Sequence, residues 1–207
     1  MKENSMPRMV SILGCLLLGC VLFAETAVAN EPSEVIKNLQ SSLVEVMKDG
    51  ETLGYQGRYE KLEPIVVGCH DIPYVARILV GKYWKTFDDQ QKAKLVKTFR
   101  QLSIATYADR FNGYAGETFT LTSQKELPRG KVLVETKFTK SDGQPIQFNY
   151  VLRKTGDQWK IVSISVDGVS DLALKRAEYM SLVKNDGYPA LIGKMENQIK
   201  KYANGTK

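Results

Sequence analysis

The stretch DIPYVARILVGKYWKTFDDQQKAKLVKTFRQLSIATYADRF, from Asp71 to Phe111, decides which fold this chain can adopt. Its apolar residues recur at helical spacing on both sides of Gly81–Trp84, so it predicts a short helix followed by a long one. It is rich in aromatic residues and has no cluster of His, Cys or paired carboxylates. The stretch therefore indicates a hydrophobic lining rather than a catalytic centre.

Over the rest of the chain, the spacing of apolar residues predicts helices, then strands, then helices again. After Asn112-Gly113 the apolar residues change from helical spacing to strict alternation, and turn signals such as Ser141–Gln144 join the strands as hairpins. We expect helices at about residues 33–49, 55–67, 71–80, 88–110, 171–184 and 188–202, and strands at about residues 117–125, 131–138, 146–153 and 158–166.

These elements predict an α+β fold, in which a four-stranded antiparallel sheet packs against N- and C-terminal helices. A curved sheet with helices over its concave side is the NTF2-like or cystatin-like arrangement. The pattern allows that arrangement without requiring it. No repeat, low-complexity linker or domain boundary interrupts residues 30–207, so we expect one domain there.

Residues 1–29 have the sequence features of a secretory signal peptide. Lys2 and Arg8 precede the apolar run Val10–Phe23, and Ala27-Val28-Ala29 supplies a small-residue cleavage site. We expect cleavage after Ala29 and export of the remaining chain. Leu17-Leu18-Gly19-Cys20 loosely resembles a lipobox, so a lipoprotein with a lipidated Cys20 is the alternative.

Charge and cysteine content narrow the class of protein further. The formal net charge is +6, which favours anionic partners or simply solubility. The basic residues are scattered and the chain is expected to be exported, so we expect no nucleic-acid partner. Beyond the leader only Cys69 remains, beside the single His70; this pair can form neither an internal disulfide nor a zinc site. We interpret Cys69 as a buried structural residue.

The usual catalytic sets are missing from the sequence. There is no Gly-x-Ser-x-Gly elbow, Ser-x-x-Lys, His-Glu-x-x-His or Walker loop. Asp88-Asp89 stands where a helix N-terminus favours acidic caps. We therefore expect no enzyme, no cofactor and no metal. The remaining enzyme hypothesis is an isomerase-like pocket in which Asp109 faces Tyr150.

Aromatic and aliphatic residues on the inward faces are the positive signal. Periodicity alone does not distinguish a filled core from a cavity wall, so both interpretations stay open. The residues expected on this inward surface are Ile72, Val75, Ile78, Leu79, Trp84, Phe99, Leu102, Tyr107, Val134, Phe138, Phe148, Tyr150, Leu172 and Tyr179.

Several segments resemble the periplasmic toluene-tolerance, or MlaC, family in order and spacing. The matching segments are Asp71–Arg77, Gly81–Trp84, Phe99–Leu102, Ala105–Tyr107, Val166–Ser170, Glu178-Tyr179, Gly187 and Leu191-Ile192. The resemblance implies an NTF2-like fold, a cavity lined by the residues above, and carriage of a lipid across the periplasm. It also implies hand-off between an inner-membrane lipid transporter and an outer-membrane lipoprotein complex.

Two segments depart from the MlaC pattern. Ser170–Tyr179 and the turn Leu127–Gly130 look more like the hopanoid-associated HpnM branch of the family. The cargo suggested by resemblance is therefore a phospholipid or a hopanoid, carried by a monomer.

We expect the cavity mouth near Gly81–Trp84. Arg77, Lys82 and Arg100 could meet an anionic headgroup there or be ordinary solvated charges. A non-catalytic adaptor subunit of an envelope complex is the alternative function.

Overall fold

A computed structural model describes Met1 and residues 31–205 of the chain. The predicted signal peptide, its cleavage site after Ala29 and Cys20 lie outside the described residues, except for Met1. The helices are α1 (Pro32–Lys48), α2 (Gly50–Cys69), α3 (Ile72–Val80), the 3₁₀ helix η1 (Gly81–Lys85), α4 (Asp89–Arg110) and α5 (Asp171–Ala203). The strands are β1 (Thr118–Leu127), β2 (Lys131–Thr139), β3 (Pro145–Thr155), β4 (Gln158–Val166) and β5 (Val169–Ser170).

Helix boundaries follow from caps and glycines in the sequence. The Asp71 side chain accepts a hydrogen bond from the backbone N–H of Tyr74 at the start of α3. Asp88 and Gln91 form a capping box at the start of α4, so Asp88 caps a helix as predicted. Gly187 has φ 81° and ψ −179°, a conformation open only to glycine, and it kinks α5 at the predicted break. Gly54 kinks α2 in the same way, directly before Tyr55, where the sequence predicted the start of the second helix.

The strands form one antiparallel sheet in the order β1-β2-β3-β4-β5. The predicted hairpins are confirmed, and the two-residue strand β5 adds a fifth member that is too short to recognise from alternation. A register shift between Val151 and Leu152 leaves Val162 as an extra residue in β4. Because of this bulge, Ile161 and Ile164 lie opposite Leu152 and Tyr150, so both face the same side of the sheet.

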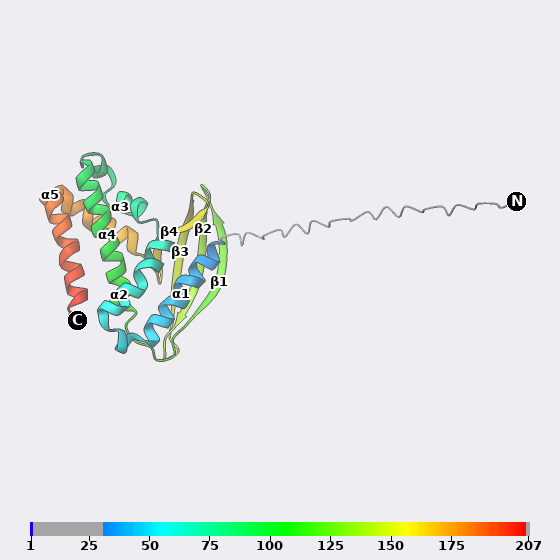
Figure 1. Ribbon diagram of the computed structural model, residues 1–207. Helices are drawn as coiled ribbons and strands as arrows, with labels where there is room; N and C mark the ends of the chain where they lie inside the picture. The colour runs from blue at the N-terminus through cyan, green and yellow to red at the C-terminus, as the bar shows by residue number, and fades with distance from the viewer. Residues whose placement is uncertain (2–30, 206–207) are drawn as a thin grey trace.

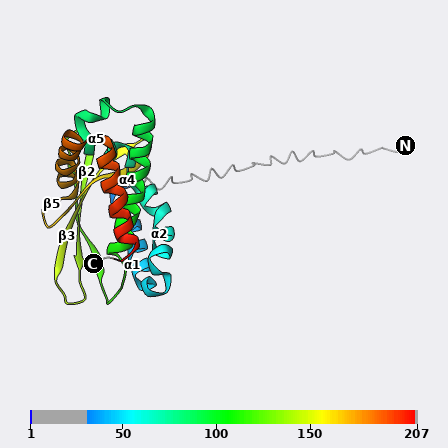
Figure 2. The same ribbon diagram turned by 90° about the vertical axis from the view of Figure 1, so that its left-hand side faces the viewer.

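All helices lie on one side of the curved sheet, with α1 directly against it (Figure 1). The second half of α5 runs alongside α4 (Figure 2). The α+β class and the sheet-and-helix arrangement are therefore as predicted. Among the residues that the structure describes, no helix is long and apolar enough to cross a bilayer.

The buried apolar residues form two clusters rather than one. The sheet cluster joins α1, α2 and the inner face of the sheet, with Leu39, Leu62 and Tyr150 among its members. The helix cluster joins α3, α4 and α5, with Leu79 and Leu191 fully buried. The helix α4 contributes to both clusters, since Ile104 belongs to the first and Leu102 to the second.

The N-terminal end of α3 is fixed to the sheet. His70 forms an isolated parallel bridge with Ile161, and the backbone N–H of Asp71 donates to the Ile161 carbonyl at 3.0 Å. The helix cluster is thus tied to β4 at the point where the two clusters meet.

Candidate functional site

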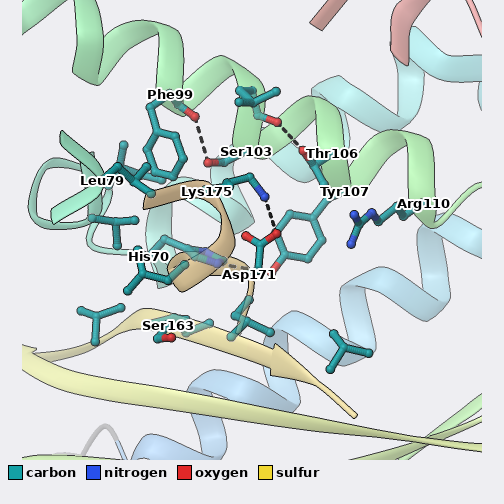
Figure 3. Close-up of a pocket in the computed structure, with 18 of the residues that line it drawn as sticks. His70, Leu79, Phe99, Ser103, Thr106, Tyr107, Arg110, Ser163, Asp171 and Lys175 are labelled. Atoms are coloured by element: carbon teal, nitrogen blue, oxygen red, sulfur yellow. Dashed lines mark hydrogen bonds and ion pairs between the residues drawn. The ribbon is translucent and has the colours of Figure 1, made fainter. Parts of the chain in front are cut away.

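A cavity of about 150 Å³ lies where the two apolar clusters meet. Its walls come from α3, α4, the β3–β4 part of the sheet and the first turns of α5 (Figure 3). The lining residues are His70, Ile72, Val75, Leu79, Phe99, Leu102, Ser103, Thr106, Tyr107, Arg110, Phe111, Phe148, Ile161, Val162, Ser163, Ile164, Val166, Asp171, Leu172 and Lys175.

Most of this lining is apolar. The hydroxyls of Ser103 and Thr106 donate to the carbonyls of Phe99 and Leu102 on their own helix, at 2.8 and 2.7 Å. Because these hydroxyls are already satisfied, they present mostly carbon to the cavity. The β4 bulge adds a continuous run, Ile161 to Ile164, to the wall. The cavity therefore suits a hydrocarbon ligand.

Three charged residues also border the cavity. Lys175 and Asp171, one turn apart on α5, form an ion pair that leaves both side chains partly exposed. Arg110 stands in the last turn of α4 and is exposed. Figure 3 places Leu79 and Phe99 at one end of the labelled lining and Arg110 at the other. Asp171 and Lys175 lie between these two ends, so the cavity has an apolar end and an opposite end at which Arg110 is the charged residue.

One polar pair lies on the cavity wall. The Tyr107 hydroxyl and His70 Nε2 are 3.2 Å apart, and His70 Nδ1 is 3.0 Å from the Val66 carbonyl. The carbonyl can only accept, so Nδ1 carries the proton and Tyr107 donates to Nε2. Burial lowers the pKa of His70 to about 4, and burial also raises the pKa of Tyr107 well above its usual value. Both side chains are therefore neutral at neutral pH.

Cys69 is not an activated nucleophile. Its thiol is buried and lies 3.1 Å from His70 Nδ1. Burial raises the pKa of the thiol to about 12, while the pKa of His70 is lowered, so the pair stays a thiol beside a neutral imidazole. A thiolate–imidazolium pair would need a lowered pKa of the thiol and a raised pKa of the imidazole. The structure thus places Cys69 as the buried residue that the sequence suggested.

Eight of the predicted inward residues line this cavity. They are Ile72, Val75, Leu79, Phe99, Leu102, Tyr107, Phe148 and Leu172. That they contact a bound lipid stays a prediction.

Six predicted lining residues lie elsewhere: Ile78, Trp84, Val134, Phe138, Tyr150 and Tyr179. Val134 and Tyr150 are buried in the sheet cluster, where α1 covers the sheet and Gln40 Nε2 lies 3.3 Å from the Tyr150 hydroxyl. Phe138 packs against Phe111, Phe119 and Phe148.

The other three predicted residues lie on α3, η1 and α5, outside the lining of the cavity. Tyr179 is buried in that cluster and Trp84 packs against it. Ile78 is half-buried on α3, with its carbonyl accepting from Arg176. Of these six residues, Val134, Tyr150 and Tyr179 are buried core positions, because helices cover the inward faces that the sequence pattern left open.

The predicted mouth at Gly81–Trp84 does not border the cavity. A Cβ on Gly81 would lie 3.0 Å from both Arg176 Nη2 and Met180 Sδ, so η1 is packed closely against α5. Arg77 and Lys82 are also absent from the lining, and Arg100 pairs with Glu63 at 2.8 Å on the surface.

Sequence reasoning missed the charged end of the cavity and much of β4. Arg110, Asp171 and Lys175 occupy helix ends, where charges usually serve as caps. The sequence did contain a signal for the bulge. Ile161 and Ile164 are three residues apart, which breaks the alternation of apolar residues at the point where β4 bulges into the cavity wall.

The isomerase-like pair does not assemble. Asp109 acts electrostatically on Tyr55 and Arg58, whereas the Tyr150 hydroxyl lies near Gln40 in the sheet cluster. Neither Asp109 nor Tyr150 lines the cavity. Across Met1 and residues 31–205, no three His, Cys, Asp or Glu side chains gather as metal ligands would.

A second hollow of about 310 Å³ lies between α2, α4 and the end of α5. It is bordered by Tyr55, Gln56, Tyr59, Gln101, Glu196, Ile199, Lys200 and Ala203. It lies more open to solvent than the cavity, and Gln56, Gln101, Glu196 and Lys200 are among its lining residues, so it lacks the enclosed apolar character of the cavity.

Two known proteins are similar to this chain in sequence. The Haemophilus influenzae intermembrane phospholipid transport system binding protein MlaC is 25% identical over 130 residues, 61% of each chain. The chain thus spans about three-fifths of that relative. Toluene tolerance protein ttg2D of Pseudomonas putida is 22% identical over 186 residues, 86% of each chain.

A solved structure shares the fold. It is a phospholipid-binding protein from Ralstonia solanacearum in complex with a phospholipid, with a TM-score of 0.72 and 17% identity. The likeness covers 84% of this chain and 98% of that one. The sequence model of the MlaC protein family matches residues 37–197, most of the described chain. The chain therefore belongs to the MlaC family.

Proposed function

We propose that this protein is a periplasmic carrier that binds the acyl chains of a phospholipid in its apolar cavity and moves the lipid between membranes. The observation that carries the proposal is the apolar cavity between sheet and helices in a member of the MlaC family. The names of the H. influenzae and R. solanacearum proteins, which concern phospholipid transport and binding, support it.

A lipid needs such a carrier because its chains resist water. Burial of one methylene is worth about 0.8 kcal/mol, so a 16-carbon chain resists leaving a bilayer by roughly 13 kcal/mol. A cavity that replaces the bilayer around the chain removes most of that barrier. The task needs binding and release but no bond-making step, which suits the neutral His70–Tyr107 pair and the protonated Cys69.

The cavity must widen for this function. Its volume of about 150 Å³ is close to that of an engineered cavity which accommodates benzene, and ligand pockets generally measure about 300–1,000 Å³. The cavity lies on the boundary between the two apolar clusters, so it can expand when the C-terminal part of α3 and the start of α5 move away from β4, while the start of α3 stays anchored to the sheet. Each cluster keeps its own packing during that movement.

The phospholipid would be received from one membrane and delivered to the other. We propose an inner-membrane lipid transporter and an outer-membrane lipoprotein complex as the partners, in keeping with the intermembrane transport system in the name of the H. influenzae relative. A hopanoid in place of the phospholipid is a further outcome that lipid identification distinguishes.

Lipid extraction tests the proposal. Protein purified from a Gram-negative host is extracted with organic solvent, and the lipids are identified and quantified by mass spectrometry. We expect about one phospholipid per chain. Protein without lipid that also takes up none from vesicles would overturn the proposal, and tight capture of envelope proteins by such protein would favour an adaptor.

A further inference from the structure

Arg110 differs from Lys175, the other cationic residue in the lining of the cavity. Lys175 is neutralised by Asp171 one turn earlier on α5. The Arg110 side chain has no hydrogen-bond or ion-pair partner among the residues that the structure describes. The charged end of the cavity therefore carries a net positive charge located on one guanidinium.

The position of Arg110 relative to the cavity is well defined. It follows Tyr107 by three residues on α4, so the two side chains share one face of the helix. Burial raises the pKa of the Tyr107 hydroxyl, and the charges of Asp171 and Arg110 add smaller raising and lowering effects. Both charges therefore lie within electrostatic range of the same cavity wall.

An exposed arginine beside an apolar cavity has a specific chemical use. Its guanidinium presents N–H donors in a planar fork that matches the oxygens of a phosphate or carboxylate. A lipid whose chains fill the apolar end, near Leu79 and Phe99, would place its headgroup at the other end, where Arg110 lies (Figure 3).

We propose that Arg110 binds the anionic headgroup of the lipid and so selects phosphate-bearing lipids over uncharged ones. This assignment rests on the proposed carrier function. It names the substrate class: a lipid with headgroup oxygens that carry negative charge, as opposed to an uncharged diacylglycerol or polycyclic alcohol. The Asp171–Lys175 pair beside it is close to neutral and leaves the selection to Arg110.

The test is a competition between two lipids with identical acyl chains. Lipid-stripped protein is incubated with vesicles containing equal amounts of phosphatidylglycerol and diacylglycerol, re-isolated, and its lipids are quantified by mass spectrometry. We expect the unmodified protein to favour phosphatidylglycerol about tenfold, the size of one charge-assisted contact. Arg110→Gln should bring the ratio close to one while total uptake persists, and Arg110→Lys should retain part of the preference.

Two further variants test whether the lipid preference depends on charge at the cavity. Lys97→Gln removes one exposed cation from the same helix away from the cavity and should leave the ratio unchanged. Asp171→Asn frees Lys175 from its partner and should raise the preference for phosphatidylglycerol. Far-UV circular dichroism checks that every variant is folded.

The outcomes separate this assignment from the carrier function. Uptake of neither lipid by the unmodified protein would overturn the carrier function itself. Equal uptake of both lipids, or an unchanged preference in Arg110→Gln, would overturn the role of Arg110 while leaving the carrier intact. Inorganic phosphate alone should neither bind measurably nor compete, and competition by millimolar phosphate would mean that the site recognises the free anion rather than a lipid.

Discussion

The carboxylate of Asp71 lies 3.0 Å from Nε of Arg153 and links the start of α3 to strand β3. The same carboxylate accepts hydrogen bonds from the Tyr74 backbone N–H and the Thr155 hydroxyl, at 3.2 and 2.8 Å. Arg153 also stacks over the Tyr74 ring, 4.0 Å from its centroid. The cavity wall formed by α3 is therefore held to the sheet by one buried acid.

Replacing this acid should destabilise the fold. Asp71→Ala removes a helix cap and leaves Arg153 without its partner, so we expect the free energy of unfolding to fall by about 3 kcal/mol. Asp71→Asn keeps the shape and loses the charge, and should show a smaller decrease. Urea denaturation measures both. Asp89→Ala, which removes a fully exposed acid from the first turn of α4, is the control and should lower the midpoint only slightly. Equal effects at the two sites would contradict the anchoring role of Asp71.

Filling the cavity should block lipid uptake without unfolding the protein. Leu102→Trp and Val75→Trp each place an indole into a cavity of about 150 Å³. We expect uptake of a fluorescent phospholipid from vesicles to fall about tenfold, because the indole occupies the space that an acyl chain needs. Leu121→Trp, at a position 39% exposed on β1, is the control. Unchanged uptake in folded cavity variants would mean that Val75 and Leu102 are only core residues.

Acid should destabilise the protein through His70. Its folded-state pKa of about 4 lies below the ordinary value near 6.5, so the unfolded chain takes up the proton first as the pH falls. Between pH 6.5 and 4 the free energy of unfolding should decrease, by up to about 3 kcal/mol for this group alone.

The matched variant for this pH effect is His70→Gln. The chain has a single histidine, so the variant removes that titration and leaves every carboxylate in place. Urea midpoints of both proteins at pH 7 and pH 4.5 give the comparison. A parallel loss of stability in the two proteins would show that His70 is not the group responsible.

Cys69 should react slowly in the folded protein. Burial raises its pKa to about 12, so the reactive thiolate is scarce near pH 8 and the reagent has poor access. We expect Ellman's reagent to label the folded chain from Asn30 onward about a thousandfold more slowly than the urea-unfolded chain. A Cys69→Ser, Ser41→Cys protein, with its thiol at an exposed position, supplies the control. Rapid labelling of folded Cys69 would refute its burial.

The sequence predicted the helical parts of the fold well because its signals are local. Asp71 and Asp88 mark helix starts, and Gly187 marks a break, through conformational preferences that need no tertiary contact. Strand β5 escaped notice because two residues show no alternation. The bulge at Val162 was not predicted because an extra residue in a strand cannot be distinguished, in the sequence, from imperfect alternation of apolar and polar residues.

The cavity was harder to predict than the fold. Residues of α3 and α4 such as Val75 and Leu102 were assigned correctly to the inner side, and they line the cavity. Val134 and Tyr150 carry the same inward pattern on the sheet, yet α1 covers them. Alternation identifies the inner face of a sheet but does not tell which part of it a helix covers. That division depends on how α1 packs, which is a tertiary property.

The meeting of two apolar clusters at the cavity has a thermodynamic consequence. A bound acyl chain would join the sheet cluster and the helix cluster into one continuous interior. Any ligand that binds only the folded chain shifts the folding equilibrium by mass action. The loaded carrier would therefore melt at a higher temperature than the lipid-free one. A partner that extracts the lipid must work against this added stability, so release to a membrane and loosening of the carrier's own interior would be a single event.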